Sequence, residues 1–210
     1  MYVPILSNIL KNSQKYLLDE SISCNCNECQ DTCPCILRYG KVYQSGVIFQ
    51  EKVNSPIIEC NSNCACQVCP HRVTQQIPSA LRIAKCGLKG LGVLAAQSIP
   101  KGKFVTEYCG EVVSPDTEGD YVFQTKENTP SRTFITTINA EYYGNVARFV
   151  NHSCDPNCEV VLVRVDSVLP RICLFSKRDI VPEEEITFCY RENVNYKRCL
   201  CNSANCKGFF

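Results

Sequence analysis

Eighteen cysteines in 210 residues place the strongest constraint on how this chain can fold. They are unevenly distributed, with nine between Cys24 and Cys69 and three between Cys199 and Cys206. In a secreted mini-protein such density would indicate disulfides. This chain is larger, and its N-terminus lacks the basic region and uninterrupted apolar run of a secretory signal. The close spacing therefore favours zinc thiolates, with a disulfide-bonded extracellular protein as the alternative.

The first cysteine group has the number and spacing of ligands expected of a multi-zinc cluster. It reads C-x-C-x2-C-x3-C-x-C and then C-x3-C-x-C-x2-C. Its members are Cys24, Cys26, Cys29, Cys33, Cys35, Cys60, Cys64, Cys66 and Cys69. Structural zinc takes four ligands in a tetrahedron. Nine thiolates can serve three zinc ions if three of them bridge two metals each. Two separate four-cysteine sites with one spare thiol are the alternative.

The C-terminal group, CLCNSANC, is one ligand short of a closed zinc site. It supplies only Cys199, Cys201 and Cys206. Among the remaining cysteines, Cys109, Cys173 and Cys189 occur in strand-like runs, where packing as small apolar residues explains them. Cys154 and Cys158 occur in RFVNHSCDPNC, a loop-like context that suits a ligand.

Between the cysteine groups, short β-branched and aromatic runs alternate with turn residues. Runs such as KFVTEY, RTFITTI and EVVLVRV predict a mostly antiparallel β fold with short helices. A short helix or turn is expected in EYYGNVARFV, and strand or loop over residues 36–50. The longest apolar runs fall far short of the roughly 20 residues that span a bilayer, so we expect no membrane segment.

The cysteine-rich part, the core and the polar C-terminal part differ in composition. With a short N-terminal segment, the chain is expected to comprise an N-terminal segment, a zinc-cluster domain, a core and a C-terminal zinc segment. Their expected bounds are residues 1–20, 21–77, 78–193 and 194–210. The last segment has too little apolar content to fold alone, so a metal must organise it. The formal net charge of +1 indicates neither a nucleic-acid nor a membrane partner.

The order of several motifs resembles the SET-domain lysine methyltransferases. After the nine-cysteine cluster come KGLGV, EYCGEVV, RFVNHSCDPN, EEEITFCY and C-x-C-x4-C. The flanking cysteines resemble the pre-SET and post-SET regions of the Suppressor-of-variegation class, and VRVDSVLPRICLFSKRDIVPEEE looks like the SET part of the SETMAR (Metnase) proteins. The resemblance covers about residues 20–210. It implies a knotted β fold, a triangular three-zinc cluster and a fourth zinc completed by Cys154.

The resemblance also implies methyl transfer from S-adenosylmethionine to a lysine side chain. Tyr190 matches the catalytic tyrosine and Tyr121 the tyrosine of the lysine channel. Phe188 matches the position where phenylalanine leaves room for di- or trimethylation. Without the resemblance, aromatic packing explains the two tyrosines equally well. The residues implied in cofactor binding are Lys89, Gly90, Leu91, Gly92, Tyr121, Arg148, Asn151, His152 and Phe209.

Four positions depart from the family pattern. Leu91 stands where Trp is usual, and Glu183 stands where Gly is usual. Asn139 and Cys189 each stand where Asp is usual. None of these departures removes Tyr190 or a zinc ligand, but they leave a catalytically inactive, zinc-rich chromatin-binding module as an alternative to an enzyme.

The resemblance implies a histone H3 tail as substrate, with lysine 9 as the expected target. Another histone lysine, such as lysine 36, or a non-histone protein is the alternative. Chromatin is the expected partner, and the nucleus and chromosome the expected location, without sequence-specific nucleic-acid binding. Thirteen zinc-bound thiolates would outweigh the charge of four zinc ions. The metal-loaded protein is therefore expected to be acidic, which suits a basic tail.

Overall fold

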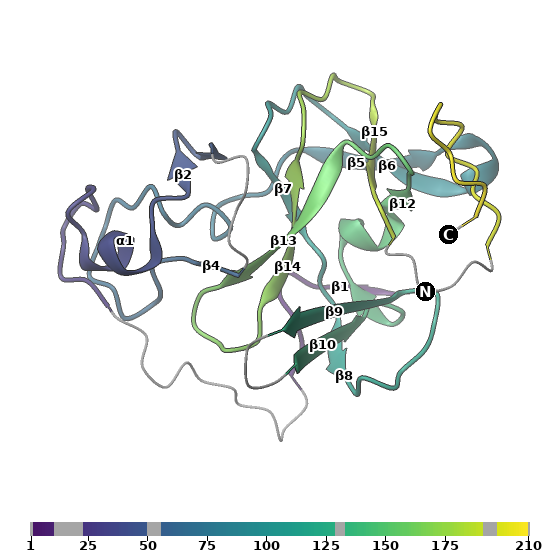
Figure 1. Ribbon diagram of the computed structural model, residues 1–210. Helices are drawn as coiled ribbons and strands as arrows, with labels where there is room; N and C mark the ends of the chain where they lie inside the picture. The colour runs from purple at the N-terminus through teal and green to yellow at the C-terminus, as the bar shows by residue number, and fades with distance from the viewer. Residues whose placement is uncertain (1, 11–22, 50–55, 129–132, 191–196, 210) are drawn as a thin grey trace.

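Figure 1 shows the computed structural model of the chain. It describes residues 2–10, 23–49, 56–128, 133–190 and 197–209. Within these residues the regular structure is mostly β, with one six-residue α-helix and two 3-10 turns. The prediction of a mostly β fold with short helices is confirmed. In this part of the chain, no helix has both the length and the apolar character needed to cross a membrane.

One four-stranded sheet, in the order β4-β13-β14-β7, carries much of the apolar core. Its strands are β4 (Ile57–Ile58), β7 (Phe104–Glu107), β13 (Cys158–Arg164) and β14 (Arg171–Ser176). β13 and β14 form an antiparallel hairpin rich in Val, Ile and Leu, residues that suit the pleated, buried surface of a sheet. Phe175 stacks on Tyr43 with ring centroids 6.2 Å apart, so this sheet also packs against the cysteine-rich region.

A second four-stranded sheet, in the order β12-β15-β6-β5, brings three distant motifs together. Its strands are β5 (Leu81–Lys85), β6 (Leu91–Ala95), β12 (Asn151–His152) and β15 (Glu185–Phe188). β12 pairs in parallel with β15, which places His152 opposite Phe188. β15 in turn pairs with β6, which begins within KGLG. The motifs KGLG, NHSC and EITFCY therefore meet in one sheet.

A three-stranded sheet, β8-β10-β9, contributes aromatic side chains to the same region. Its strands are β8 (Glu111–Val113), β9 (Val122–Asn128) and β10 (Thr133–Asn139). Tyr121 directly precedes β9. The ring centroid of Phe123 lies 5.2 Å from that of Tyr108 and 5.3 Å from that of Phe188. These contacts join the three-stranded sheet to β15.

In the cysteine-rich region, sulfur takes the place of apolar carbon. The buried residues of its core cluster are seven cysteines and Ile36. Helix α1 (Pro34–Tyr39) begins with Pro34 in its first turn, where the missing N–H costs no hydrogen bond. The hairpin β2 (Tyr43–Gln44) and β3 (Val47–Ile48) follows. The expectation of strand or loop over residues 36–50 is therefore wrong for the part that α1 covers, because the helical turn carries Cys35 into the cluster.

The two ends of the described chain both pack on the core. At the N-terminal end, β1 (Val3–Pro4) pairs in parallel with β11 (Tyr143–Gly144). At the C-terminal end, a bridge between Arg198 and Phe209 closes residues 197–209 into a loop. The two 3-10 turns are η1 (Gly87–Lys89) and η2 (Val146–Phe149), and η2 confirms the turn expected in EYYGNVARFV. Figure 1 shows the cysteine-rich region and the C-terminal loop at opposite ends of the molecule.

Candidate functional site

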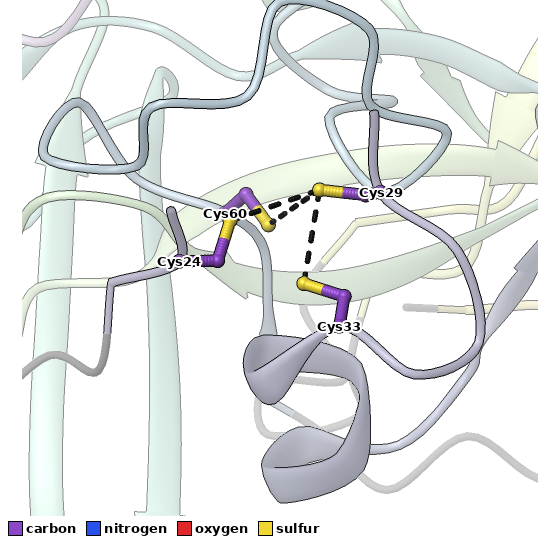
Figure 2. Close-up of side chains that lie close together, drawn as sticks. All are labelled: Cys24, Cys29, Cys33 and Cys60. Atoms are coloured by element: carbon purple, nitrogen blue, oxygen red, sulfur yellow. Dashed lines mark hydrogen bonds between the residues drawn. The ribbon is translucent and has the colours of Figure 1, made fainter. Parts of the chain in front are cut away.

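Eight of the nine N-terminal cysteines form three overlapping groups of four sulfurs. In each group all four sulfurs lie within 4.8 Å of one another. The groups are Cys24, Cys29, Cys33 and Cys60; Cys24, Cys35, Cys60 and Cys64; and Cys29, Cys60, Cys66 and Cys69. Cys24, Cys29 and Cys60 each belong to more than one group, and Figure 2 shows these three converging with Cys33. Cys26 belongs to none of the groups but packs against the same cluster.

The spacing of the sulfurs fits tetrahedral zinc and not disulfides. A zinc ion with Zn–S bonds of about 2.3 Å separates its ligand sulfurs by about 3.8 Å. Cys29 Sγ lies 3.7 Å from Cys24 Sγ, 3.7 Å from Cys33 Sγ and 4.0 Å from Cys60 Sγ. A disulfide requires about 2.05 Å. All eighteen cysteines lie in the described part of the chain, and none of them forms a disulfide.

A fourth group of sulfurs joins the C-terminal loop to the core. Its members are Cys154, Cys199, Cys201 and Cys206. Cys154 Sγ lies 3.7 Å from Cys199 Sγ, again a spacing that fits shared zinc. Cys158, the other candidate ligand, is buried in the core formed with β14 and β15, and burial raises its pKa to about 12. The structure therefore brings Cys154, and not Cys158, to the C-terminal cysteines.

His152 connects this group of sulfurs to Tyr190. The backbone N–H of Tyr190 donates to His152 Nδ1 at 3.0 Å, so the neutral ring carries its proton on Nε2. His152 Nε2 lies 3.3 Å from Cys154 Sγ, which makes it a donor to that sulfur. The ring also packs edge-on against Tyr190, with centroids 5.5 Å apart. Burial lowers the pKa of His152, which favours this neutral form.

Tyr190 and Phe188 lie within an aromatic cluster. The Tyr190 hydroxyl donates to the backbone carbonyl of Val150 at 2.7 Å. Burial, with smaller effects of Tyr121 and Glu185, raises its pKa to about 12, so the hydroxyl stays protonated at neutral pH. The rings of Phe188 and Tyr190 lie 4.8 Å apart. The three residues suggested by the family resemblance, Tyr121, Phe188 and Tyr190, thus occupy one region.

The loop before β6 forms one wall of a cavity of about 340 Å³. That volume lies at the lower end of the range typical of small-molecule sites. The opposite wall belongs to the C-terminal loop. The lining residues are Cys86, Gly87, Leu88, Lys89, Glu185, Leu200, Cys201 and Asn202. A bound cofactor there would contact both the KGLG loop and the zinc-organised segment, so the residues present fit such a group.

Glu185 connects Lys89 of the cavity wall to Asn151, a role that the sequence analysis missed. It forms an ion pair with Lys89 and accepts a hydrogen bond of 2.9 Å from Asn151 Nδ2. Asn151 Nδ2 also donates to the carbonyl of Leu91 at 3.1 Å. A Cβ added to Gly92 would lie 2.8 Å from Asn151 Nδ2, so close packing explains this glycine. The sequence signal for this role was the run of three glutamates in EEEITFCY, of which Glu185 is the last.

Among the expected cofactor residues, all of which lie in the described part of the chain, only Lys89 lines this cavity. Gly90 adopts a φ of +83°, a conformation that favours glycine. Arg148 lies over the ring of Tyr121, with its Nε donating to Ala140 O at 2.8 Å. Phe209 is 54% exposed and is not among the cavity-lining residues.

The departures from the family pattern have distinct local environments. Glu183 adopts a φ of +67°, the left-handed conformation that glycine accepts without strain, and its carboxylate pairs with Arg82. Asn139 Oδ1 accepts a hydrogen bond of 2.9 Å from the N–H of Glu141.

Of the three cysteines expected to pack as small apolar residues, Cys109 and Cys173 are buried as expected. Cys189 is exposed, so its expected packing role is wrong, because β15 ends one residue earlier at Phe188.

Comparisons with known proteins define the class of fold. The family model for the SET domain matches residues 90–191, and the model for the Pre-SET motif matches residues 2–72. The methyltransferase domain of human histone-lysine N-methyltransferase SETMAR superposes with a TM-score of 0.83 at 28% identity. This superposition covers 100% of this chain and 88% of the SETMAR domain. The architecture is therefore that of a SET domain with a pre-SET region.

The sequence relatives identify the family. A probable histone-lysine N-methyltransferase, set-23 of Caenorhabditis briggsae, is 35% identical over 214 residues, covering 91% of this chain and 88% of the relative. Human SETMAR is 32% identical over 213 residues, covering 85% of this chain but only 31% of SETMAR. The chain belongs to the SET-domain histone-lysine N-methyltransferases, a family of enzymes. The resemblance described from the motifs is confirmed.

One further solved structure of similar fold contains bound ligands. The structure of KRYPTONITE in complex with mCHH DNA, an H3(1-15) peptide and SAH superposes with a TM-score of 0.86 at 26% identity. The superposition covers 99% of this chain and 47% of KRYPTONITE. Members of this fold family thus bind the demethylated cofactor and an H3 peptide in solved structures.

Proposed function

We propose that this protein transfers methyl groups from S-adenosylmethionine to a lysine of the histone H3 tail. The observation that carries the proposal is that β15 joins two features, because Glu185 at its start lines the cavity with Lys89 and the C-terminal loop, and Phe188 at its end packs against Tyr190. The cofactor supplies an electrophilic methyl group. The protein's contribution is then positioning and electrostatics, as in other in-line displacements.

The lysine must reach the methyl group as a neutral amine. With an ordinary pKa near 10.4, roughly 0.04% of free lysine is neutral at pH 7. Tyr190 remains protonated and is oriented by its bond to the Val150 carbonyl, and in this proposal its oxygen orients the incoming amine by accepting a hydrogen bond from it. The aromatic rings around it exclude water, which favours the uncharged amine.

Phe188 supports the transfer of more than one methyl group. Its ring stacks on Phe123 at an interplanar angle of 19° and carries no hydroxyl that could hold a water molecule or fix the amine. A partly methylated lysine can therefore rotate to present its remaining lone pair. We accordingly assign di- or trimethylation to this protein, with lysine 9 of H3 as the target, in a nuclear, chromatin-associated setting.

Four zinc ions would complete the fold. One would be held by Cys24, Cys26, Cys29 and Cys33, a second by Cys24, Cys35, Cys60 and Cys64, and a third by Cys29, Cys60, Cys66 and Cys69. This division uses the shared sulfurs Cys24, Cys29 and Cys60 as the three bridges and gives the outlying Cys26 a metal. The fourth ion would be held by Cys154, Cys199, Cys201 and Cys206. In this arrangement zinc is structural and takes no part in the transfer.

The test is methyl transfer from radiolabelled S-adenosylmethionine to H3 tail peptides. Peptides in which lysine 4, 9, 27 or 36 is replaced by arginine identify the target. We expect wild type to label every peptide that retains lysine 9, and the matched control Tyr190→Phe to bind the cofactor but lose at least about 100-fold in rate. Cofactor binding by wild type without labelling of any histone peptide would favour the inactive chromatin-binding module.

A further inference from the structure

Residues 2–9 form an extended strap along the core. The N–H of Val3 donates to Tyr142 O at 2.7 Å, and the N–H of Ile5 donates to Gly144 O at 2.7 Å. Further along, the N–H of Ile9 donates to Gly110 O at 2.9 Å. These backbone bonds fix the strap independently of most of its side chains.

The strap ends at the guanidinium group of Arg148. Arg148 Cζ lies 3.8 Å from the ring centroid of Tyr121, 4.5 Å from that of Tyr2 and 4.8 Å from that of Phe149. These distances fall within the range of cation–π contacts. Tyr2 also packs edge-on against Phe149, with centroids 5.6 Å apart. Three aromatic rings from separate parts of the chain therefore surround one cation.

Hydrogen bonds restrict where the guanidinium group can move. Arg148 Nε donates to Ala140 O at 2.8 Å, and a terminal nitrogen donates to Glu141 O at 3.3 Å. Among the described residues, no carboxylate forms a salt bridge with Arg148. Its charge therefore faces carbonyl oxygens and aromatic rings. The hydrogen bonds hold the edge of the guanidinium group, and the aromatic rings restrain the tilt of its plane.

Tyr121 has a fixed backbone and a partly exposed side chain. Its carbonyl accepts hydrogen bonds from the hydroxyl of Tyr108 at 2.7 Å and from the N–H of Ala140 at 3.0 Å. These bonds hold the main chain but leave rotation about the Cα–Cβ bond free. The stack on Arg148 restrains that rotation, and Tyr2 in turn restrains Arg148.

We propose that the strap sets the orientation of the Tyr121 ring through a Tyr2–Arg148–Tyr121 stack, which makes Tyr2 a positioning residue for the lysine substrate. The inference rests on the proposed function, in which Tyr121 lines the lysine channel. Tyr2 touches neither substrate nor cofactor in this scheme. Its effect reaches the substrate only through the two side chains of the stack.

Four variants separate the stack from the strap itself. Tyr2→Ala removes the ring, and Tyr2→Leu keeps apolar bulk against Phe149 but removes the aromatic face. Tyr2→Phe keeps the face and is the conservative rescue. Leu6→Ala is the matched control, because Leu6 lies on the same strap with 97% of its surface exposed. Zinc content and thermal unfolding establish that each variant is folded.

Kinetics provide the first measurement. We expect Tyr2→Ala and Tyr2→Leu to raise KM for the H3 peptide about tenfold when the cofactor is saturating. Tyr2→Phe and Leu6→Ala should retain the wild-type KM. An unchanged KM in folded Tyr2→Leu would overturn the proposal.

A spectroscopic measurement does not depend on activity. In protein labelled with 3-fluorotyrosine, the ¹⁹F resonance of residue 121 can be assigned with Tyr121→Phe. We expect that resonance to shift in Tyr2→Ala and Tyr2→Leu and to stay in place in Leu6→Ala. If the wild type methylated no peptide, the proposed function would fail while this shift could still establish the stack. A resonance that stays in place in every variant would refute the stack itself.

Discussion

The two cysteine sites use the same ligand chemistry in opposite structural settings. The N-terminal cysteines are mostly buried and form their own core, whereas Cys206 is exposed and Cys154 and Cys201 are half-buried. The N-terminal cluster lies at the far end of the molecule from the C-terminal loop (Figure 1). Among the described residues, only the C-terminal group bonds to a residue of the candidate active site, through His152.

This difference indicates two different uses of a metal. The buried residues of the cysteine cluster are seven cysteines and Ile36, so metal binding free energy would be much of the folding free energy there. In the C-terminal loop, Leu200, Cys201 and Asn202 form a wall of the cavity. Metal binding there would complete a ligand site on a core that is already folded.

The largest effect should come from Cys60→Ser in the N-terminal cluster. Cys60 is fully buried and belongs to all three groups of sulfurs. A structural zinc contributes roughly 10–16 kcal/mol in peptides, comparable to the roughly 5–15 kcal/mol that stabilises a whole domain. We therefore expect loss of all three N-terminal zinc ions and protease sensitivity of residues 23–76, measured by native mass spectrometry and limited proteolysis.

Cys26→Ser is the control for that experiment. Cys26 lies at the edge of the cluster and would serve one metal only, so its replacement should remove at most one zinc ion. If Cys60→Ser retained three N-terminal zinc ions, the shared-sulfur arrangement would be incorrect.

Cys154→Ser should have a smaller and more local effect. It removes the ligand that connects the C-terminal loop to the core, so one zinc ion should be lost while the N-terminal cluster stays intact. Because that loop forms a cavity wall, cofactor affinity should fall at least about tenfold, or about 1.4 kcal/mol, in calorimetry. Retention of both the zinc and the affinity would disprove the coupling between them.

Replacements of His152 should sharpen the comparison, because they separate its two hydrogen bonds. Asparagine places an oxygen where Nδ1 accepts from Tyr190, and glutamine places a donor where Nε2 reaches Cys154. We expect His152→Asn to release the C-terminal zinc more readily, by about 10- to 100-fold in affinity, with little change in kcat. His152→Gln should keep the zinc and lower kcat.

Zinc affinity from chelator competition and kcat from peptide methylation are the two measurements for this pair. The structure predicts that His152→Asn weakens zinc binding but not kcat, and that His152→Gln lowers kcat but keeps the zinc. Equal losses of both quantities in both variants would indicate that His152 acts only as a packing residue.

The sequence was most informative where the chemistry is local. Closely spaced thiolates can be counted, so the ligand shortage of the C-terminal group was evident, and the family resemblance identified Cys154. Short β-branched runs predicted the strands because their pattern is set by neighbouring residues. The family resemblance also marked Glu183 as standing where glycine is usual, and the structure gives that residue a left-handed conformation.

The sequence was least informative where side chains meet across long separations. Lys89 and Glu185 are 96 positions apart, and only the pairing of β6 with β15 brings them together. The contact between Tyr2 and Arg148 was hidden for a similar reason, because it depends on the course of the strap along the core. Which thiolates bridge likewise depends on the folded arrangement of the cluster and not on cysteine spacing.

The smallest effect is expected from Cys158→Ala. This variant tests whether a cysteine becomes a zinc ligand through its place in the fold or merely through its closeness to Cys154 in the sequence. Cys158 lies four residues after Cys154 but packs in the apolar core as a protonated thiol. Its truncation leaves a small cavity and should cost about 1 kcal/mol of the free energy of unfolding, measured by urea denaturation. Zinc content and cofactor affinity should match wild type. Loss of a zinc ion would instead make Cys158 a ligand, and the contrast between the two sites would then extend into the core of the SET domain.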